Sequence, residues 1–402
     1  MPAISLLPDG SELKDVMLPR YDENHILVGV LKSKTMTLVN SGQVAGTTVS
    51  VEFFNPDQSP RGRIDLKKAT FYQDKGLLAA NEPVTIKSDQ VNAHGSGLYY
   101  SFVEGKGFLL GPATTTIKAP PKTTMNSPHA PLRATAMLGM TMLATPIIAA
   151  APPRALTAEE TAAIQADAES KAPAAAAAAA TTRTTLDSDL ADSTAASKAV
   201  STFLVQAELP PVPQDTPPSP AKPLDITPGP EDTVINSTGG IYFDPDEGVL
   251  VYLKNVTVKD PRFNLSGADE LKVFFAKKPA KEKKDAPKLP EKSKDPLGGG
   301  IGANFGDVEK IVATGAVLLD QKPTEAGKEP IKASGAIFTY NIKADQVILK
   351  GGYPWVMQGK TFMRAKEPNL ILRISPKAGG FITEGNWEMG GNLEQKKPGK
   401  KP

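Results

Sequence analysis

A strand pattern occurs twice in this chain, in segments that lie about 240 residues apart. The segment from Val91 to Gly111 aligns without a gap with the segment from Ile331 to Gly351. Five positions are identical: Ala93/Ala333, Gly95/Gly335, Tyr100/Tyr340, Leu109/Leu349 and Gly111/Gly351. Repeated hairpin-sized units indicate an architecture that grows by adding strands, in which function lies on a long shared surface.

A second ungapped alignment supports this interpretation. It pairs Phe71–Ile86 with Phe243–Val258, and Phe, Asp, Gly, Leu, Val and Thr coincide in the two segments. Both segments contain an Asp and a Gly between two apolar runs, which is the chemistry of a tight turn between strands. The repeats therefore predict strands joined by short turns in both halves of the chain.

Composition excludes several classes of function. The chain of 402 residues has 46 Lys and Arg against 44 Asp and Glu, and this balance gives no overall charge for nucleic-acid binding. It has no cysteine, which excludes disulfides, thiolate zinc sites and thiol nucleophiles. We expect no nucleic-acid partner.

Three regions follow one another along the chain. Residues 1–122 contain short β-branched or aromatic runs bounded by Gly, Pro, Asn and Asp, and residues 239–392 repeat this pattern. Residues 123–238 are rich in Ala and Pro, and we expect a linker with short helices, one of them over Asp187–Glu208. A Lys-rich loop is expected at 277–306 and a basic tail at 393–402.

The linker contains an uncharged apolar segment, residues 134–151, that ends in small residues. It is shorter than a membrane-spanning helix of about 20 apolar residues and is interrupted by Pro146. A signal-peptide core is the favoured interpretation, and a membrane anchor or an apolar linker are the alternatives. Because such a signal is internal here, we expect an incomplete or misassigned start of the chain.

The sequence offers no constellation of catalytic residues. The three histidines, His25, His94 and His129, are scattered and have no acidic neighbours at metal-ligand spacing. The glycine-rich stretch at 298–302 lacks the Lys-Ser/Thr of a phosphate-binding loop. We therefore expect neither an enzyme nor a cofactor or metal site.

Strands with two apolar rows leave open which row faces the interior. In the segment 249–258, Leu250, Tyr252, Val256 and Val258 form one row, while Val249, Val251 and Leu253 belong to the other. One explanation is that both rows fill a sandwich core. The other is that one row packs and the other meets a partner or a lipid.

Ordered motifs in the second block resemble the OstA/LptA family of lipopolysaccharide transport proteins. The segments that carry the resemblance begin at Gly240 (GIYFD), Gly267 (GADELKVFF), Ile311 (IVATGAV) and Ala333, and the last extends to Pro354. In the first block, Glu82–Asp89 is similar to the opening strand of that family, and residues 77–117 resemble the related LptC-type domain.

The resemblance implies an all-β fold of two partly open β-jellyroll modules with antiparallel strands. It also implies a non-enzymatic function, in which an apolar groove shelters the acyl chains of lipid A and the protein bridges the periplasm toward the outer membrane. The implied partners are lipopolysaccharide and other Lpt-type jellyroll proteins, which pair through edge strands, and the inner membrane is a further candidate contact. By motif position, the expected lipid-binding residues are Val84, Ile86, Leu250, Tyr252, Val256, Val258, Ile331, Phe338, Tyr340, Val347 and Leu349.

The alternative to a lipid carrier is a structural or assembly module of the cell envelope. Such a module has a dry β core and binds protein partners through open sheet edges. A polysaccharide-processing enzyme is a more distant alternative, because it requires clustered acids on one strand face. The two leading hypotheses differ in whether lipid enters the interior.

Overall fold

The computed structural model describes residues 8–21, 25–55, 57–118, 186–205, 228–277, 305–323, 329–375 and 380–391. The chain divides into two units, residues 1–120 together with 189–402, and residues 121–188. All contacts discussed below lie within the first unit. The described residues form antiparallel strands and one helical segment, 186–205, so the predicted all-β class is confirmed.

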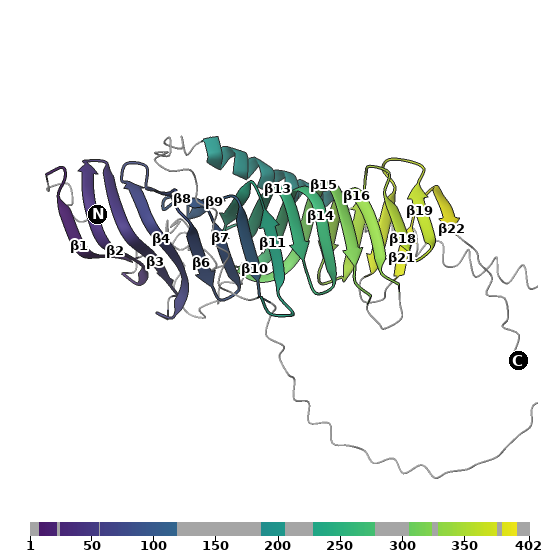
Figure 1. Cartoon of the computed structure of the whole chain (residues 1–402), viewed down its shortest axis with the longest axis horizontal. Coiled ribbons are helices and arrows are strands. Elements are labelled where there is room, and N and C mark those ends of the chain that lie inside the picture. Colours follow the sequence, from purple (N-terminus) through teal and green to yellow (C-terminus); the bar gives the residue numbers. More distant parts are fainter. Residues whose placement is uncertain are drawn as a thin grey trace, which may run out of the picture. The chain divides into compact units, whose positions relative to one another are not determined.

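The first block contributes ten strands (Figure 1). They are β1 (Glu12–Tyr21), β2 (Leu27–Asn40), β3 (Gln43–Phe54), β4 (Pro60–Tyr72), β5 (Leu77–Ala80), β6 (Val84–Ser88), β7 (Val91–Gly95), β8 (Gly97–Ser101), β9 (Lys106–Leu110) and β10 (Ala113–Ile117).

The second block contributes the remaining strands of the described residues. They are β11 (Thr233–Ser237), β12 (Gly240–Asp244), β13 (Val249–Lys259), β14 (Phe263–Lys277), β15 (Phe305–Gln321), β16 (Ile331–Asn341), β17 (Gln346–Lys350), β18 (Trp355–Gln358), β19 (Thr361–Ala365), β20 (Ile371–Ser375), β21 (Gly380–Thr383) and β22 (Trp387–Gly391). The Lys-rich loop expected at 277–306 lies largely outside the described residues.

The long strands each belong to two layers, because their two halves pair with different short strands. β4 pairs with β5 through one half and with β6 through the other. In the same way, β13 pairs with β12 and β11. β16 likewise pairs with β17 and β18. The first layer contains the short strands β5, β8, β9, β12, β17, β20 and β21. The second contains β6, β7, β10, β11, β18, β19 and β22.

The long strands bend where they pass from one layer to the other. Lys254 and Asn255 in β13 have φ values of 60° and 47°, Gly267 in β14 has 73° and Gly315 in β15 has 127°. The strand register shifts at these same places, which is the signature of β-bulges. Glycine suits two of the bends because it adopts a positive φ without steric cost.

The two layers enclose one apolar core. Aromatic side chains meet across it: Phe263 of the second layer lies 5.9 Å from the ring of Phe338 and 5.6 Å from that of Tyr340 in the first layer. Along each layer, residues paired from strand to strand form an inward row. The first-layer row is Leu38, Val44, Phe71, Leu78, Tyr100, Gly107, Phe243, Leu250, Val273, Ile311, Tyr340, Val347, Ile374 and Phe381.

The second layer has a matching row. It consists of Leu18, Leu31, Val51, Ile64, Ile86, Ala93, Thr115, Ile235, Val258, Leu265, Leu319, Ala333, Val356, Met363 and Met389. These two inward rows run through both blocks, and only Thr115 among their members is polar without an aromatic ring. The rows of paired residues therefore extend from β1 to β22, with Leu38 and Val44 in a small separate cluster at one end and Met389 66% exposed at the other.

Backbone hydrogen bonds join the two blocks directly. β10 pairs with β11 in the second layer, and β9 pairs with β12 in the first. At this junction Phe243 stacks on Tyr100, with ring centroids 6.1 Å apart and an angle of 17° between the rings. The domain limits expected at residues 122, 238 and 392 stay predictions, and the β pairing crosses the boundary that they would place between the blocks.

The helix at 186–205 packs on the outer side of the first layer (Figure 1). Its apolar side chains Ala196, Val200 and Phe203 share a small core with residues of the sheet that include Tyr242 and Val251. Polar contacts flank this core: Lys310 of β15 forms ion pairs with Asp189 and Asp192 at 2.7 and 2.6 Å. The helix predicted over Asp187–Glu208 is present over the described residues 186–205, and it packs against the sheet through Val200 and Phe203.

Candidate functional site

The expected lipid-binding residues lie together in the interior. All eleven belong to the core between the layers, and each has a relative exposure of 4% or less: Val84, Ile86, Leu250, Tyr252, Val256, Val258, Ile331, Phe338, Tyr340, Val347 and Leu349. The question of which row of β13 faces inward is thereby answered. Leu250 and Tyr252 point into the core, while Val249 and Val251 pack under the helix.

Tyr340 is the one predicted residue whose polar group makes several contacts. Arg262 donates from Nη1 to the Tyr340 hydroxyl at 2.7 Å, and its guanidinium lies 5.1 Å from the centre of the ring. Burial raises the pKa of Tyr340 to about 12. Arg262 also donates to both carboxylate oxygens of Asp260, so a charged cluster closes the core beside this ring. The Tyr340 hydroxyl is therefore engaged by the protein itself.

An apolar cavity of about 400 Å³ opens between the layers at the β1–β4 end. This volume is in the range of small-molecule sites in proteins. One side is formed by β1–β3 of the second layer and the other by β2–β4 of the first layer with the turn after β8. The lining consists of Leu18, Pro19, Arg20, Tyr21, Gly29, Val30, Leu31, Met36, Val44, Val51, Phe53, Phe71, Gln73 and Phe102.

The cavity exists because this end of the sandwich has fewer strands. β1, β2 and β3 are long strands that bend across both layers, and among the described residues β1 pairs only with β2. In the described part of the chain, no short strand adds side chains between their two halves. Leu18 and Leu31 are only partly buried, whereas their counterparts further along the second-layer row, Ile64 and Ile86, are fully buried. The two inward rows thus end in an open apolar groove.

Sequence reasoning missed this cavity. None of the eleven predicted residues lines it: Ile86 lies deeper along the second-layer row, and Val84 pairs with Leu66 next to that row. The signal that was available is the alternation of apolar residues in β2 and β3, such as Val49, Val51 and Phe53. This alternation shows that one face is apolar, but it does not show that the face lacks a covering strand.

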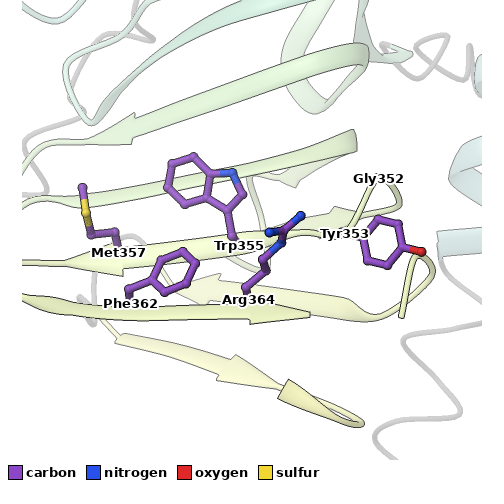
Figure 2. A pocket seen from close by; sticks show the side chains of 6 residues that line it. All are labelled: Gly352, Tyr353, Trp355, Met357, Phe362 and Arg364. Carbon is purple, nitrogen blue, oxygen red and sulfur yellow. The ribbon is translucent and has the colours of Figure 1, made fainter. Parts of the chain in front are cut away.

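A second hollow, of about 470 Å³, lies on the outer side of the second layer near the C-terminal end (Figure 2). Trp355 and Met357 of β18 stand beside Arg364 and Phe362 of β19, and Tyr353 lies at one end. Tyr353, Met357 and Phe362 are 45%, 36% and 37% exposed. The inward neighbours Val356 and Met363 point to the core, so this aromatic patch is separated from the interior by the sheet itself.

The described residues show no site for a metal and no span of the membrane. Across the described ranges, no three acidic, histidine or cysteine side chains are placed together as metal ligands. No helix within those ranges is long and apolar enough to cross a bilayer. The apolar segment 134–151 lies outside the described residues.

Comparisons with known proteins find similarity at the level of solved structures. No family model and no curated protein matches the chain. A solved structure, described as LptH, the LptA homologous periplasmic component of the conserved lipopolysaccharide transport device from Pseudomonas aeruginosa, matches 39% of this chain and 93% of its own, at 15% identity and a TM-score of 0.29. At that TM-score the likeness carries no argument about function.

Proposed function

We propose that this protein is a non-enzymatic lipopolysaccharide carrier of the periplasm, which shelters lipid A acyl chains between its two β layers. The observation that carries the proposal is the apolar cavity at the β1–β4 end, which continues the two inward rows. An acyl chain that enters it leaves water for an apolar surface, and this transfer is favourable by about 25 cal/mol per Å² of apolar surface. The motif resemblance supplies lipopolysaccharide as the ligand.

In this proposal the eleven interior residues form the continuation of the groove. Their side chains are packed against one another, and Tyr252 and Leu349 have no exposed surface. A lipid chain can reach them only if the two layers move apart. The cavity is therefore the entry site, and contact with Tyr252 or Leu349 requires an opened form of the sandwich.

A matched pair of positions on β1 tests the proposal. A photo-crosslinking amino acid at Leu18 faces the cavity, and the same group at the adjacent Met17, which is 61% exposed, faces the opposite side. The purified full chain is irradiated with lipopolysaccharide, and adducts are detected with an antibody to it. We expect an adduct at Leu18 and little at Met17. No adduct at Leu18, or equal adducts at both positions, would contradict the proposal.

The second candidate function is an assembly module of the cell envelope, and the aromatic patch in Figure 2 favours it. Tyr, Trp, Met and Arg are the residues enriched in protein interfaces and their energetic hot spots. Open edges for strand pairing are also present, because among the described residues β1, β21 and β22 each pair with a single neighbour. Substitution of Phe362 by Ser should weaken binding of a jellyroll partner and leave the Leu18 adduct unchanged if the two surfaces act independently.

A further inference from the structure

The described lining of the cavity is mostly apolar and includes one charged side chain. Arg20 is the single ionic residue among the described lining residues, and Tyr21 and Gln73 are the other polar side chains there. Arg20 lies on β1 opposite Gly29, which in turn pairs with Phe53. Because glycine has no side chain, position 29 adds no side-chain bulk opposite Arg20, and a Cβ atom there would lie 3.2 Å from the backbone oxygen of Glu52.

The guanidinium of Arg20 is held against an aromatic wall. Its central carbon lies 5.6 Å from the centre of the Phe102 ring, which is the geometry of a cation–π contact. Phe102 packs in turn on Tyr100, with ring centroids 5.0 Å apart. Burial raises the pKa of Tyr100, and the positive charges of Arg61 and Arg20 oppose this rise. The charge of Arg20 therefore acts on the interior as well as on solvent.

This combination is suited to an anionic amphiphile. An apolar tail fits the surface formed by Leu31, Val51 and Phe71, while a guanidinium binds carboxylate or phosphate oxygens through two parallel hydrogen bonds. Arg20 has other interactions as well, and the five N–H donors of a guanidinium allow it to contact more than one group. A neutral amphiphile fills the same apolar surface and gains nothing from the guanidinium.

We propose that Arg20 is the headgroup-recognition residue of the cavity and that it selects amphiphiles with an anionic headgroup, whether phosphate or carboxylate, over neutral ones. This inference rests on the proposed function, since it assumes that the cavity binds acyl chains. It goes further by naming the charge of the ligand and the side chain that reads it. Arg20 also marks the end of the cavity at which the headgroup stays.

Three probes with the same twelve-carbon tail test the proposal: dodecyl phosphate, dodecanoate and the neutral dodecyl maltoside, each below its critical micelle concentration. Binding to the full chain is measured by displacement of the neutral dye Nile red. We expect both anions to displace the dye at about tenfold lower concentration than the maltoside, because one hydrogen-bonded interaction with a charged group is enough to give such a gain in affinity. Unequal effects of the two anions would show which headgroup the site prefers.

Arg20→Gln should remove the preference for the anions, so that all three probes displace the dye at similar concentrations. Arg20→Lys should keep part of the preference, because it retains charge without the planar fork. Arg63→Gln is the matched control: Arg63 is on β4, 51% exposed, and pairs with Asp65 at 2.6 Å outside the cavity. Circular dichroism verifies that each variant is folded.

The outcomes separate this inference from the proposed function. If none of the three probes displaces the dye, the cavity binds no acyl chain and the proposed function fails. If all three bind equally to the wild type, or if Arg20→Gln keeps the preference, the cavity remains a lipid site but Arg20 does not recognise the headgroup. A loss of preference in Arg63→Gln also overturns the role of Arg20.

Discussion

The junction between the two blocks can be tested through the contact of Gly107 with Phe243. These residues pair between β9 and β12, and the Phe243 ring occupies the space in which a side chain at 107 would lie. A methyl group placed on Gly107 would overlap Cζ of that ring and would also lie 2.8 Å from both Cε atoms, against 3.4 Å or more in ordinary van der Waals contact. The substitution Gly107→Ala therefore forces the ring to move by more than the roughly 0.6 Å that the two Cε atoms alone would require.

The ring has little freedom to move. Phe243 is 2% exposed and stacks on Tyr100. Overpacking of this kind typically costs about 1–3 kcal/mol of unfolding free energy. Phe243→Ala removes the ring and costs about 3–5 kcal/mol through lost burial and the cavity left behind. In that background Gly107→Ala meets open space, so the double variant should be less destabilised than the two single costs combined, by about 1–3 kcal/mol.

Urea unfolding of the four proteins measures this coupling, with two optical probes. Far-ultraviolet circular dichroism reports strands of both blocks. Tryptophan fluorescence reports only the C-terminal end, because the two tryptophans of the chain are Trp355 and Trp387. If the shared hydrogen bonds make the blocks unfold together, Gly107→Ala shifts the midpoint of both signals equally.

Two results would refute this reasoning. If the destabilisation of the double variant equals the sum of the two single variants to within about 0.5 kcal/mol, Gly107 and Phe243 do not share space. A shift of the dichroism transition without a shift of the fluorescence transition would show that the blocks unfold independently despite their pairing. A change in the slope of the denaturant dependence would instead indicate a departure from two-state unfolding.

Two further predictions concern charged clusters at the edges of the core. Burial alone would raise the pKa of Asp260, but hydrogen bonds from Arg262 outweigh it and hold the pKa below its ordinary value of 3.8. Stability from this pair is thus present above about pH 4 and lost as pH falls through the lowered pKa. Asp260→Asn should lower the free energy of unfolding by about 1.5–3 kcal/mol at pH 7 and weaken its dependence on pH in acid. Urea midpoints measured between pH 2 and 7 test this, and the same pH dependence in variant and wild type would contradict it. Burial alone would lower the pKa of Lys310, but hydrogen bonds to Asp189 and Asp192 have the larger combined effect and raise this pKa above its ordinary value of 10.5. The stability from these ion pairs is therefore present below about pH 10.5 and is lost as pH rises through the raised pKa. Lys310→Met should speed amide hydrogen exchange in the helical residues 189–205 and leave exchange in β20 unchanged. Equal exchange of the helix in the variant and the wild type would show that the Lys310 ion pairs do not hold the helix on the sheet.

Much of the fold could be predicted from local signals. The aligned repeats correspond to equivalent elements: β16 occupies the place of β7 and β8, which are separated only by Ser96, and β17 occupies the place of β9. Turn residues and apolar alternation are local properties, so they mark strands and hairpins well. The pairing of β10 with β11 is different, because Thr114 contacts Asn236 across 122 positions and no local pattern encodes such a partner.

The candidate site could be predicted less completely. The motif positions included Leu250 and Tyr252, which lie in the core, but the sequence left open which row of β13 faces inward. They did not reveal that the interior there is packed, or that it opens at Leu18 and Leu31. Packing depends on which strands cover a face, and that is a property of the assembled layers. The eleven residues stay predicted lipid contacts, and Arg20 joins them as a proposed one.

The long separation between β10 and β11 has a consequence for biosynthesis. Thr114 of β10 and its partner Asn236 are 122 residues apart, so a ribosome that adds about 5–20 residues per second supplies the second strand roughly 6–24 s after the first. During that interval the newly made β9 and β10 have no partner on their later side. An unpaired strand edge of this kind is a template for wrong pairing. A factor that covers this edge while the intervening residues are made would therefore protect the protein at its most vulnerable stage.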